Sequence, residues 1–234
     1  MSDFSKPSFA QLIEANRRSI QRVVDFDCLK DRLLNMDFTA QNTELNSEIL
    51  DDTVLFSNWV NQKLAVYDAR YGIGGYNEHR TIYSRSAHFD TGEEPRRLHL
   101  GVDIWAPAGT TVYNFHDAVV HSFANNNRFG DYGATIILTY EIESIQFNVL
   151  YGHLSLSSLE SLAEGQFIPA ATAFASLGVK EENGYWPPHL HFQVIQDMEN
   201  LKGDYPGVCK YSEREKYLAN CPDPNIIFQS TFIT

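Results

Sequence analysis

The chain has 234 residues, of which 43% are hydrophobic, so it is long enough to bury a sizeable core in one large or two small domains. Its 18 basic and 30 acidic residues give a net charge of -12. A protein that binds nucleic acid or an anionic membrane carries a basic surface instead, so neither is expected as a partner.

No stretch supplies the roughly 18 apolar residues that a membrane-spanning helix needs. Glu14, Arg17 and Arg18 interrupt the N-terminus, which therefore lacks the apolar segment of a signal peptide. We expect a cytoplasmic protein, or one exported by a non-classical route. The cysteines are an odd number without CxxC spacing, so we expect free thiols, or a pairing of the last two if the protein is exported: Cys28, Cys209 and Cys221.

Residues 1–70 are expected to be mainly helical. Apolar residues spaced near 3.6 predict a helix over about 8–24, capped by its first residue, a second over Cys28–Met36 and a third that starts at residue 51 or 52. No metal-ligand or nucleophile spacing occurs here. We interpret this region as an N-terminal appendage that serves packing or binds a protein partner.

The second predicted domain is 71–234. It opens with the glycine-rich run Tyr71–Asn77, which we expect to be a hinge, because it lacks the patterns of phosphate-binding loops. From Leu98 onwards, short apolar runs separated by turn residues are typical of an all-β unit. Strands are expected at Leu98–Ile104, Thr111–Phe115, Ala118–Phe123, Thr135–Tyr140, Ser144–Tyr151, Ala173–Leu177 and Leu190–Ile195, with a short helix at Leu156–Gly165 and a tail over 203–224 that wraps the surface.

Two histidines stand two residues apart in the stretch Trp186–Val194. Because side chains alternate along a strand, His189 and His191 would share one face, with Leu190, Phe192 and Val194 on the other. Such a pair can place one imidazole on a metal and the second beside it. Alone, the pattern more often contains one surface histidine and one packed histidine.

A second cluster lies upstream, where His99 and Asp103 share strand parity and Gly101 between them leaves room for a close approach. Two histidines and a carboxylate form a ligand set of catalytic zinc sites, which keep a fourth position open. A third element, Tyr151–Ser155, contributes His153.

HxxxD, YGH and HxH in this order, with the run Ala106–Tyr113 after the first of them, resemble the lysostaphin-type (LytM-like) zinc endopeptidases, which cleave peptide cross-bridges in bacterial cell walls. The resemblance covers roughly residues 70–198. It implies an α+β chain in which a helical N-terminal segment precedes a mainly antiparallel β domain, with one zinc ion in a groove on one sheet face. The implied substrate is a peptide or a peptidoglycan-like polymer.

Carried over by this resemblance, the ligand role falls to His99, Asp103 and His191, and the acid–base or transition-state role to His153 and His189. Zinc held in this way polarises the scissile carbonyl and lowers the pKa of its water towards roughly 7. A histidine suits the accompanying proton transfers near neutral pH.

Two departures from the family pattern stand out. The run Glu93–Arg97 replaces the glycine-rich or tyrosine-bearing run of many relatives, which leaves the oxyanion-stabilising group open among Tyr83, Tyr113 and Arg97. The chain also shows no wall-binding repeat. The other histidines are expected at the surface or in hydrogen bonds: His79, His88, His116 and His121.

The predicted function is that of a zinc-dependent metallo-endopeptidase. A catalytically idle zinc-binding domain that regulates a partner, and a hydrolase of a non-peptide amide, are the alternatives. A serine hydrolase is disfavoured, because the GxSxG nucleophile elbow does not occur in the sequence.

Overall fold

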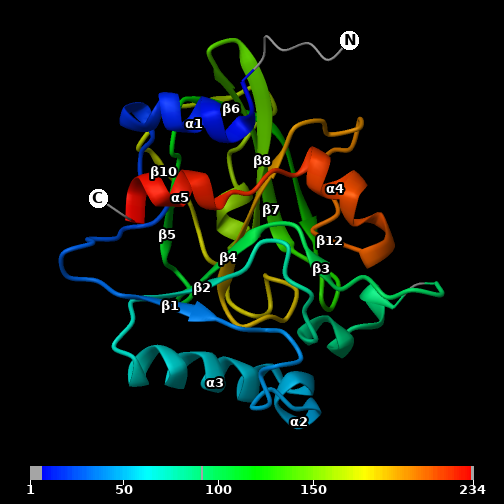
Figure 1. Ribbon diagram of the computed structural model, residues 1–234. Coiled ribbons are helices and arrows are strands. Elements are labelled where there is room, and N and C mark those ends of the chain that lie inside the picture. Colours follow the sequence, from blue (N-terminus) through cyan, green and yellow to red (C-terminus); the bar gives the residue numbers. More distant parts are fainter. Residues whose placement is uncertain (1–6, 91, 233–234) are drawn as a thin grey trace.

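The computed structural model describes residues 7–90 and 92–232. Within these ranges, one eight-stranded sheet forms the centre of the molecule (Figure 1). Neighbouring strands are antiparallel except for the first two, and their spatial order is β1 (Leu33–Met36), β2 (Tyr71–Gly74), β4 (Val102–Trp105), β11 (His189–Ile195), β8 (Ile145–Leu154), β7 (Gly133–Ile142), β6 (Ala118–Asn126) and β9 (Phe167–Ile168). The predicted α+β class with a mainly antiparallel sheet is confirmed.

Two smaller sheets complete the β-structure of the described chain. They pair β5 (Thr111–Tyr113) with β10 (Ala173–Ser176), and β3 (Leu98–His99) with β12 (Val208–Cys209). The α-helices are α1 (Phe9–Ala15), α2 (Ser47–Asp51), α3 (Thr53–Val66), α4 (Arg214–Asn220) and α5 (Asn225–Phe232). None of the described helices is long and apolar enough to cross a bilayer.

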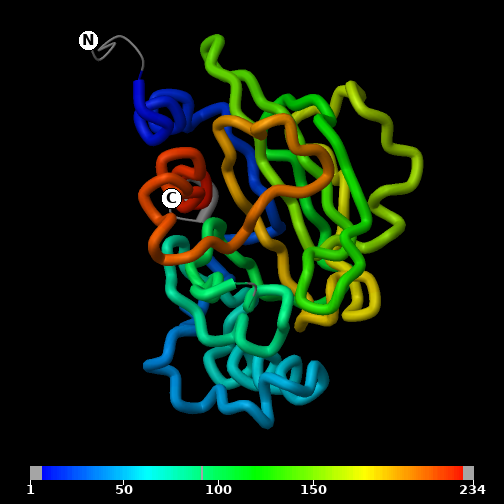
Figure 2. The backbone as a smooth tube through the Cα atoms, turned by 90° about the vertical axis from the view of Figure 1, so that its right-hand side faces the viewer, coloured from blue at the N-terminus to red at the C-terminus, as the bar shows by residue number. Residues whose placement is uncertain are grey.

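Helices α1 and α5 lie side by side over one face of the main sheet (Figures 1 and 2). Their buried side chains share a core with Leu190, Phe192 and Val194 of β11. The ring of Phe228 in α5, for example, lies 4.8 Å from that of Phe192. The predicted alternation along this strand is therefore confirmed, and its histidines lie on the opposite face.

A second hydrophobic cluster joins α3 to the histidine-bearing side of the sheet. Phe56 packs between Trp105 of β4 and Trp186, with ring centroids 6.0 and 6.5 Å away. The helix begins where expected, because the Asp52 carboxylate accepts hydrogen bonds from two backbone N–H groups of the first turn. The N-terminal helices thus support the elements that carry the histidines.

The first helix prediction in the N-terminal region, over residues 8–24, is wrong in part. Helix α1 ends at Ala15, where the Asn16 side chain donates to the Leu12 carbonyl and closes the last turn. A 3-10 turn, Arg17–Ser19, follows it, and the chain then runs extended to Val23, which is buried and whose carbonyl accepts a hydrogen bond from the Tyr113 N–H of β5. The apolar spacing there reflects burial of an extended segment rather than a helical face.

The stretch Cys28–Met36 is not a helix but a turn followed by β1. The predicted hinge after residue 70 is β2, and its glycines make room for neighbours: a Cβ on Gly72 would lie 2.8 Å from Cγ of Met36 and 3.2 Å from Cβ of Trp105. Strands β1 and β2 pair across the predicted domain boundary. The division at residue 70 itself stays a prediction.

Later elements differ from expectation in detail. The predicted strand Leu98–Ile104 is broken at Leu100–Gly101 into β3 and β4, which belong to different sheets. The expected helix after Leu156 is one 3-10 turn, Leu156–Leu159. The tail contains β12 and α4, with α5 directly after it, and buries Tyr205 and Cys221 rather than only wrapping the surface.

Candidate metal centre

The sheet register brings two of the predicted ligands together. His191 of β11 stands directly opposite Asp103 of β4, and His189 stands opposite Trp105. His99 reaches the same place from β3, because the chain turns between β3 and β4. All three predicted ligands are buried, and His191 comes from a strand far along the sequence from the other two.

Gly101 makes this convergence possible. A Cβ built on this residue would lie 2.7 Å from Cε1 of His191 and 2.8 Å from the backbone oxygen of Phe192. At such distances the new Cβ or its neighbours must move. The backbone oxygen belongs to β11, which is hydrogen-bonded to its neighbouring strand and packed in the interior, so it cannot move easily. The sequence predicted that Gly101 leaves room for a close approach. The ring of His191, a predicted ligand, occupies this room.

We expect Gly101→Ala to destabilise the protein by about 1–3 kcal/mol through overpacking and to weaken zinc binding by displacing His191. Denaturant melts and zinc titrations measure the two effects. Gly109→Ala is the control: its φ of 82° adds a backbone cost that Gly101→Ala does not carry, but no atom lies within 4 Å of the new Cβ, so zinc binding should persist. Wild-type zinc affinity in Gly101→Ala would contradict the argument.

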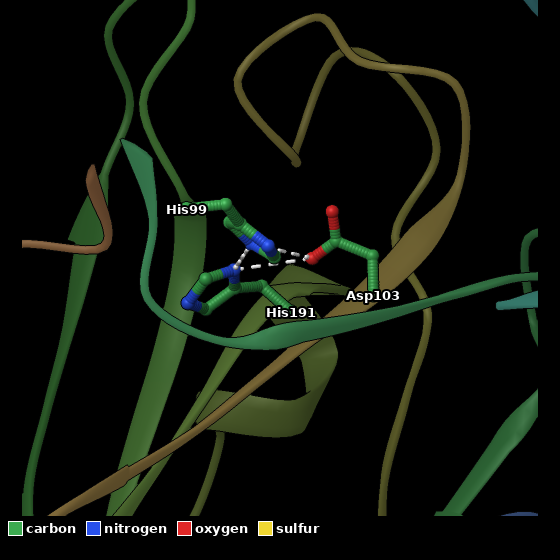
Figure 3. A group of neighbouring side chains, drawn as sticks. All are labelled: His99, Asp103 and His191. Carbon is green, nitrogen blue, oxygen red and sulfur yellow. Dashed lines mark hydrogen bonds and ion pairs between the residues drawn. The ribbon is translucent and has the colours of Figure 1, made fainter. Parts of the chain in front are cut away.

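Three ligand atoms face one another (Figure 3). His191 Nδ1 lies 2.9 Å from His99 Nε2 and 3.1 Å from Asp103 Oδ1, and His99 Nε2 lies 3.3 Å from the same carboxylate oxygen. A tetrahedral zinc ion with bonds of about 2.0–2.1 Å holds its ligand atoms about 3.3 Å apart. The spacing is close to that of a preformed zinc site.

The hydrogen bonds on the outer side of each ring fix which nitrogen carries the proton. His99 Nδ1 donates to the Gly75 carbonyl at 2.9 Å, and His191 Nε2 donates to Gln193 Oε1 at 2.8 Å. The converging nitrogens are then unprotonated and, with the carboxylate of Asp103, form three electron pairs directed at one point. Such a set is repulsive without a cation and matches the donor chemistry that zinc prefers.

A fully buried arginine, Arg80, holds the other oxygen of Asp103. Its Nε also donates to Glu78 Oε2 at 2.6 Å. Burial opposes ionisation of Asp103, but favourable charge interactions, among them that with the Arg80 guanidinium, outweigh it and keep the pKa of this carboxyl well below its usual range. Asp103 is therefore a carboxylate that offers one oxygen to a metal.

The two predicted proton-transfer residues lie beside the ligands. The rings of His153 and His189 are 4.0 Å apart, and His189 stacks on Trp105 at 4.0 Å. His153 Nδ1 donates to the Asn183 carbonyl at 2.8 Å, and His189 Nδ1 donates to the Pro187 carbonyl at 2.7 Å. In both rings, Nε2 is thus the unprotonated nitrogen.

Burial keeps both of these histidines neutral. It lowers the pKa of His189 to about 4 and, reinforced by the neighbouring ring, that of His153 well below its usual range. The backbone of His153 also has a φ of 63°, in the left-handed region, which costs a residue other than glycine about 1–3 kcal/mol and clusters at functional sites. Hydrogen bonds to Tyr132 and Gly178 hold it there.

The centre lies in the wall of a cavity of about 310 Å³. His153, His189, His191 and Asp103 all line it, with aromatic walls from Tyr83, Phe89, Trp105, Tyr132, Trp186 and Tyr205. Of the histidines expected at the surface or in hydrogen bonds, His88 also lines this cavity, whereas His79, His116 and His121 do not.

The sequence patterns missed Gln193 and the contact between Arg80 and Asp103. Gln193 carries a signal, because it stands two residues after His191 and therefore on the same strand face. Arg80 carries none, since its place beside Asp103 follows from the path of the chain after β2.

Solved structures with partial likeness to this chain include peptidases. A zinc-containing peptidase of Vibrio cholerae is 27% identical over 42% of this chain and 27% of its own, with a TM-score of 0.33. A putative peptidase M23 of Pseudomonas aeruginosa is 19% identical over 56% of this chain and 44% of its own, with a TM-score of 0.38. This chain spans less than half the length of either.

The catalytic domain of the antimicrobial peptidase lysostaphin from Staphylococcus simulans is 20% identical over 68% of this chain and 97% of its own, with a TM-score of 0.41. No curated protein matches the chain. The model of peptidase family M23 matches residues 97–202, which include every predicted site residue. Residues 97–202 of this chain therefore carry the sequence pattern of peptidase family M23.

Proposed function

We propose that this chain is a zinc-dependent metallo-endopeptidase that hydrolyses peptide bonds in cross-bridge-like peptides of the bacterial cell wall. The observation that supports this most directly is the convergence of three unprotonated ligand atoms beside two neutral histidines in one cavity. The family match supports a peptidase, and the substrate class follows from the family resemblance.

The chain's own groups supply the proton transfers of such a hydrolysis. When bound, zinc would act as a Lewis acid on the scissile carbonyl and lower the pKa of the attacking water towards about 7. His153 and His189 present unprotonated Nε2 atoms that accept the water proton and return it to the leaving amine. Positioned general bases of this kind contribute about 10²–10⁴-fold to a rate.

Tyr83 is the best placed of the three candidates for stabilising the oxyanion. It lines the cavity, and its hydroxyl oxygen accepts a hydrogen bond from Arg80 Nη1 at 3.3 Å, which leaves its own proton for donation. Burial raises the pKa of this phenol, so it stays protonated. Tyr113 instead packs under Arg22, and Arg97 is paired with Asp90.

The test is cleavage of a peptide panel by the zinc-reconstituted protein, followed by mass spectrometry. We expect cuts within glycine- or D-amino-acid-containing peptides. Cleavage should be lost after treatment with a chelator and should recover with about one equivalent of zinc, because zinc binding and catalysis share this centre. An all-L peptide without glycine and a set of non-peptide amides are run beside them.

Two other outcomes separate the alternatives. Bound zinc without turnover of any compound would favour an idle zinc-binding domain, against which the two backbone-oriented histidines already count. Turnover of the non-peptide amides alone would favour an amide hydrolase. The cytoplasmic location and the protein partner of residues 1–70 stay predictions.

A further inference from the structure

Gln193 of β11 lies beside the metal centre, although it is neither a predicted ligand nor a predicted proton-transfer residue. Its side chain is fully buried on the same strand face as His189 and His191. Its Oε1 accepts the hydrogen bond from His191 Nε2 at 2.8 Å. The residue therefore controls the outer nitrogen of a ligand whose inner nitrogen faces the metal position.

The orientation of the Gln193 amide is itself fixed. Its Nε2 donates to the Pro206 carbonyl at 3.1 Å and to Cys221 Sγ at 3.4 Å. A flipped amide would bring its oxygen against the Pro206 carbonyl, and two acceptors would face each other. Burial raises the pKa of the Cys221 thiol to about 12, so the sulfur is neutral and accepts this bond as a thiol.

This orientation dictates the tautomer of His191. The amide oxygen has no proton to give, so the ring proton must sit on Nε2 and the lone pair on Nδ1. Nδ1 is the atom 2.9 Å from His99 Nε2 and 3.1 Å from Asp103 Oδ1. With the opposite tautomer, a proton rather than a lone pair would face the other two ligands.

The segment that holds Gln193 also holds His99. Strand β12 pairs with β3, where Val208 stands opposite His99, and the Leu100 N–H donates to the Gly207 carbonyl at 2.9 Å. A Cβ on Gly207 would lie 3.3 Å from Cε1 of His191. The chain around residues 206–209 thus lies against both histidine ligands.

We propose that Gln193 is a positioning residue of the metal centre, which holds His191 in the tautomer that presents Nδ1 to the metal and is itself held by Pro206 and Cys221. This inference rests on the proposed function, because it assumes that the centre binds a metal ion. Partners of this kind behind a ligand are worth about 10–100-fold in metal affinity.

The test compares three full-length variants by chelator-competition measurements of the zinc dissociation constant. Gln193→Met, similar in length but without the acceptor, should raise this constant about 10–100-fold. Gln193→Glu keeps an acceptor for His191 but sets its second oxygen against the Pro206 carbonyl, so it should weaken zinc binding less than Gln193→Met does. Asn114→Leu is the matched control, because Asn114 is an equally buried amide, bonded to Ile168 and Tyr140, outside the cavity lining.

A second readout, nitrogen NMR of the histidine rings in the metal-free protein, separates this inference from the proposed function. We expect His191 to carry its proton on Nε2 in the wild type and to lose that preference in Gln193→Met. Should that variant fail to fold, Gln193→Asn, whose amide is one methylene too short, replaces it. An unchanged tautomer or an unchanged zinc affinity, or equal weakening in Asn114→Leu, would overturn the proposal. If the wild-type protein binds no zinc, the proposed function is wrong. The position of the ring proton on His191 in the wild type and in Gln193→Met then shows whether Gln193 sets the tautomer.

Discussion

His191→Ala should purify without zinc, whereas the wild-type protein should hold about one ion per chain. The substitution removes one of three converging ligand atoms and leaves His99 and Asp103, too few to form the usual three-ligand catalytic zinc site. An ion in 100- to 1,000-fold excess over its dissociation constant stabilises a folded protein by about 2.7–4.1 kcal/mol. For a chain of this size this is roughly 5–16 °C in melting temperature. The variant should lack this rise in melting temperature. Metal analysis measures its zinc content, and thermal melts with and without a chelator measure the stabilisation.

The matched control for this variant is His189→Ala. It removes the same side chain two residues away on the same face of β11, and leaves all three ligand atoms in place. It should therefore keep its zinc and its chelator-sensitive melting temperature. Full zinc content in His191→Ala together with loss in His189→Ala would show that the two histidines had been assigned the wrong way round.

Removing either proton-transfer histidine should lower turnover about 10²–10⁴-fold while zinc stays bound. His153 and His189 both direct their protonated Nδ1 at a backbone carbonyl, so their unprotonated Nε2 atoms remain for the water and the leaving group. Steady-state kinetics on a peptide that the wild type cleaves, with the zinc content of each preparation, measure the effect on kcat.

The variant at His153 needs its own design, because this residue has left-handed backbone geometry. Asparagine tolerates that conformation better than alanine does, so His153→Asn removes the imidazole at the smaller cost in backbone strain. Turnover within threefold of the wild type in either variant would remove that histidine from the proposed mechanism. Loss of zinc in His153→Asn would make His153 a ligand instead.

Much of the site was predictable because it depends on short-range geometry. Alternation along a strand placed His189 and His191 on one face and the apolar residues on the other, and the structure agrees. The same rule applied one step further would have included Gln193. The HxxxD spacing brought His99 and Asp103 together even though the strand between them is broken at Gly101, since that turn also directs both side chains to one place.

The remainder depends on contacts that no local pattern encodes. The carbonyls of Gly75, Asn183 and Pro187 orient three histidines, yet any residue type has a carbonyl, so the sequence gives no signal for them. The helix predicted over Cys28–Met36 failed for a related reason. Leu33 and Leu34 became part of β1 because a glycine-rich neighbour, Tyr71–Gly74, was available for pairing, whereas Leu29 is exposed.

The residues that orient the ligands have a consequence for any attempt to excise the peptidase segment. Gly75, Arg80, Pro206 and Cys221 all lie outside residues 97–202. A fragment cut at the limits of the family match would retain every ligand and lose most of what orients them. The smallest unit that preserves these contacts runs from residue 75 to residue 221, so the segment that the family model matches is smaller than the part of the chain that supplies the contacts orienting the ligands.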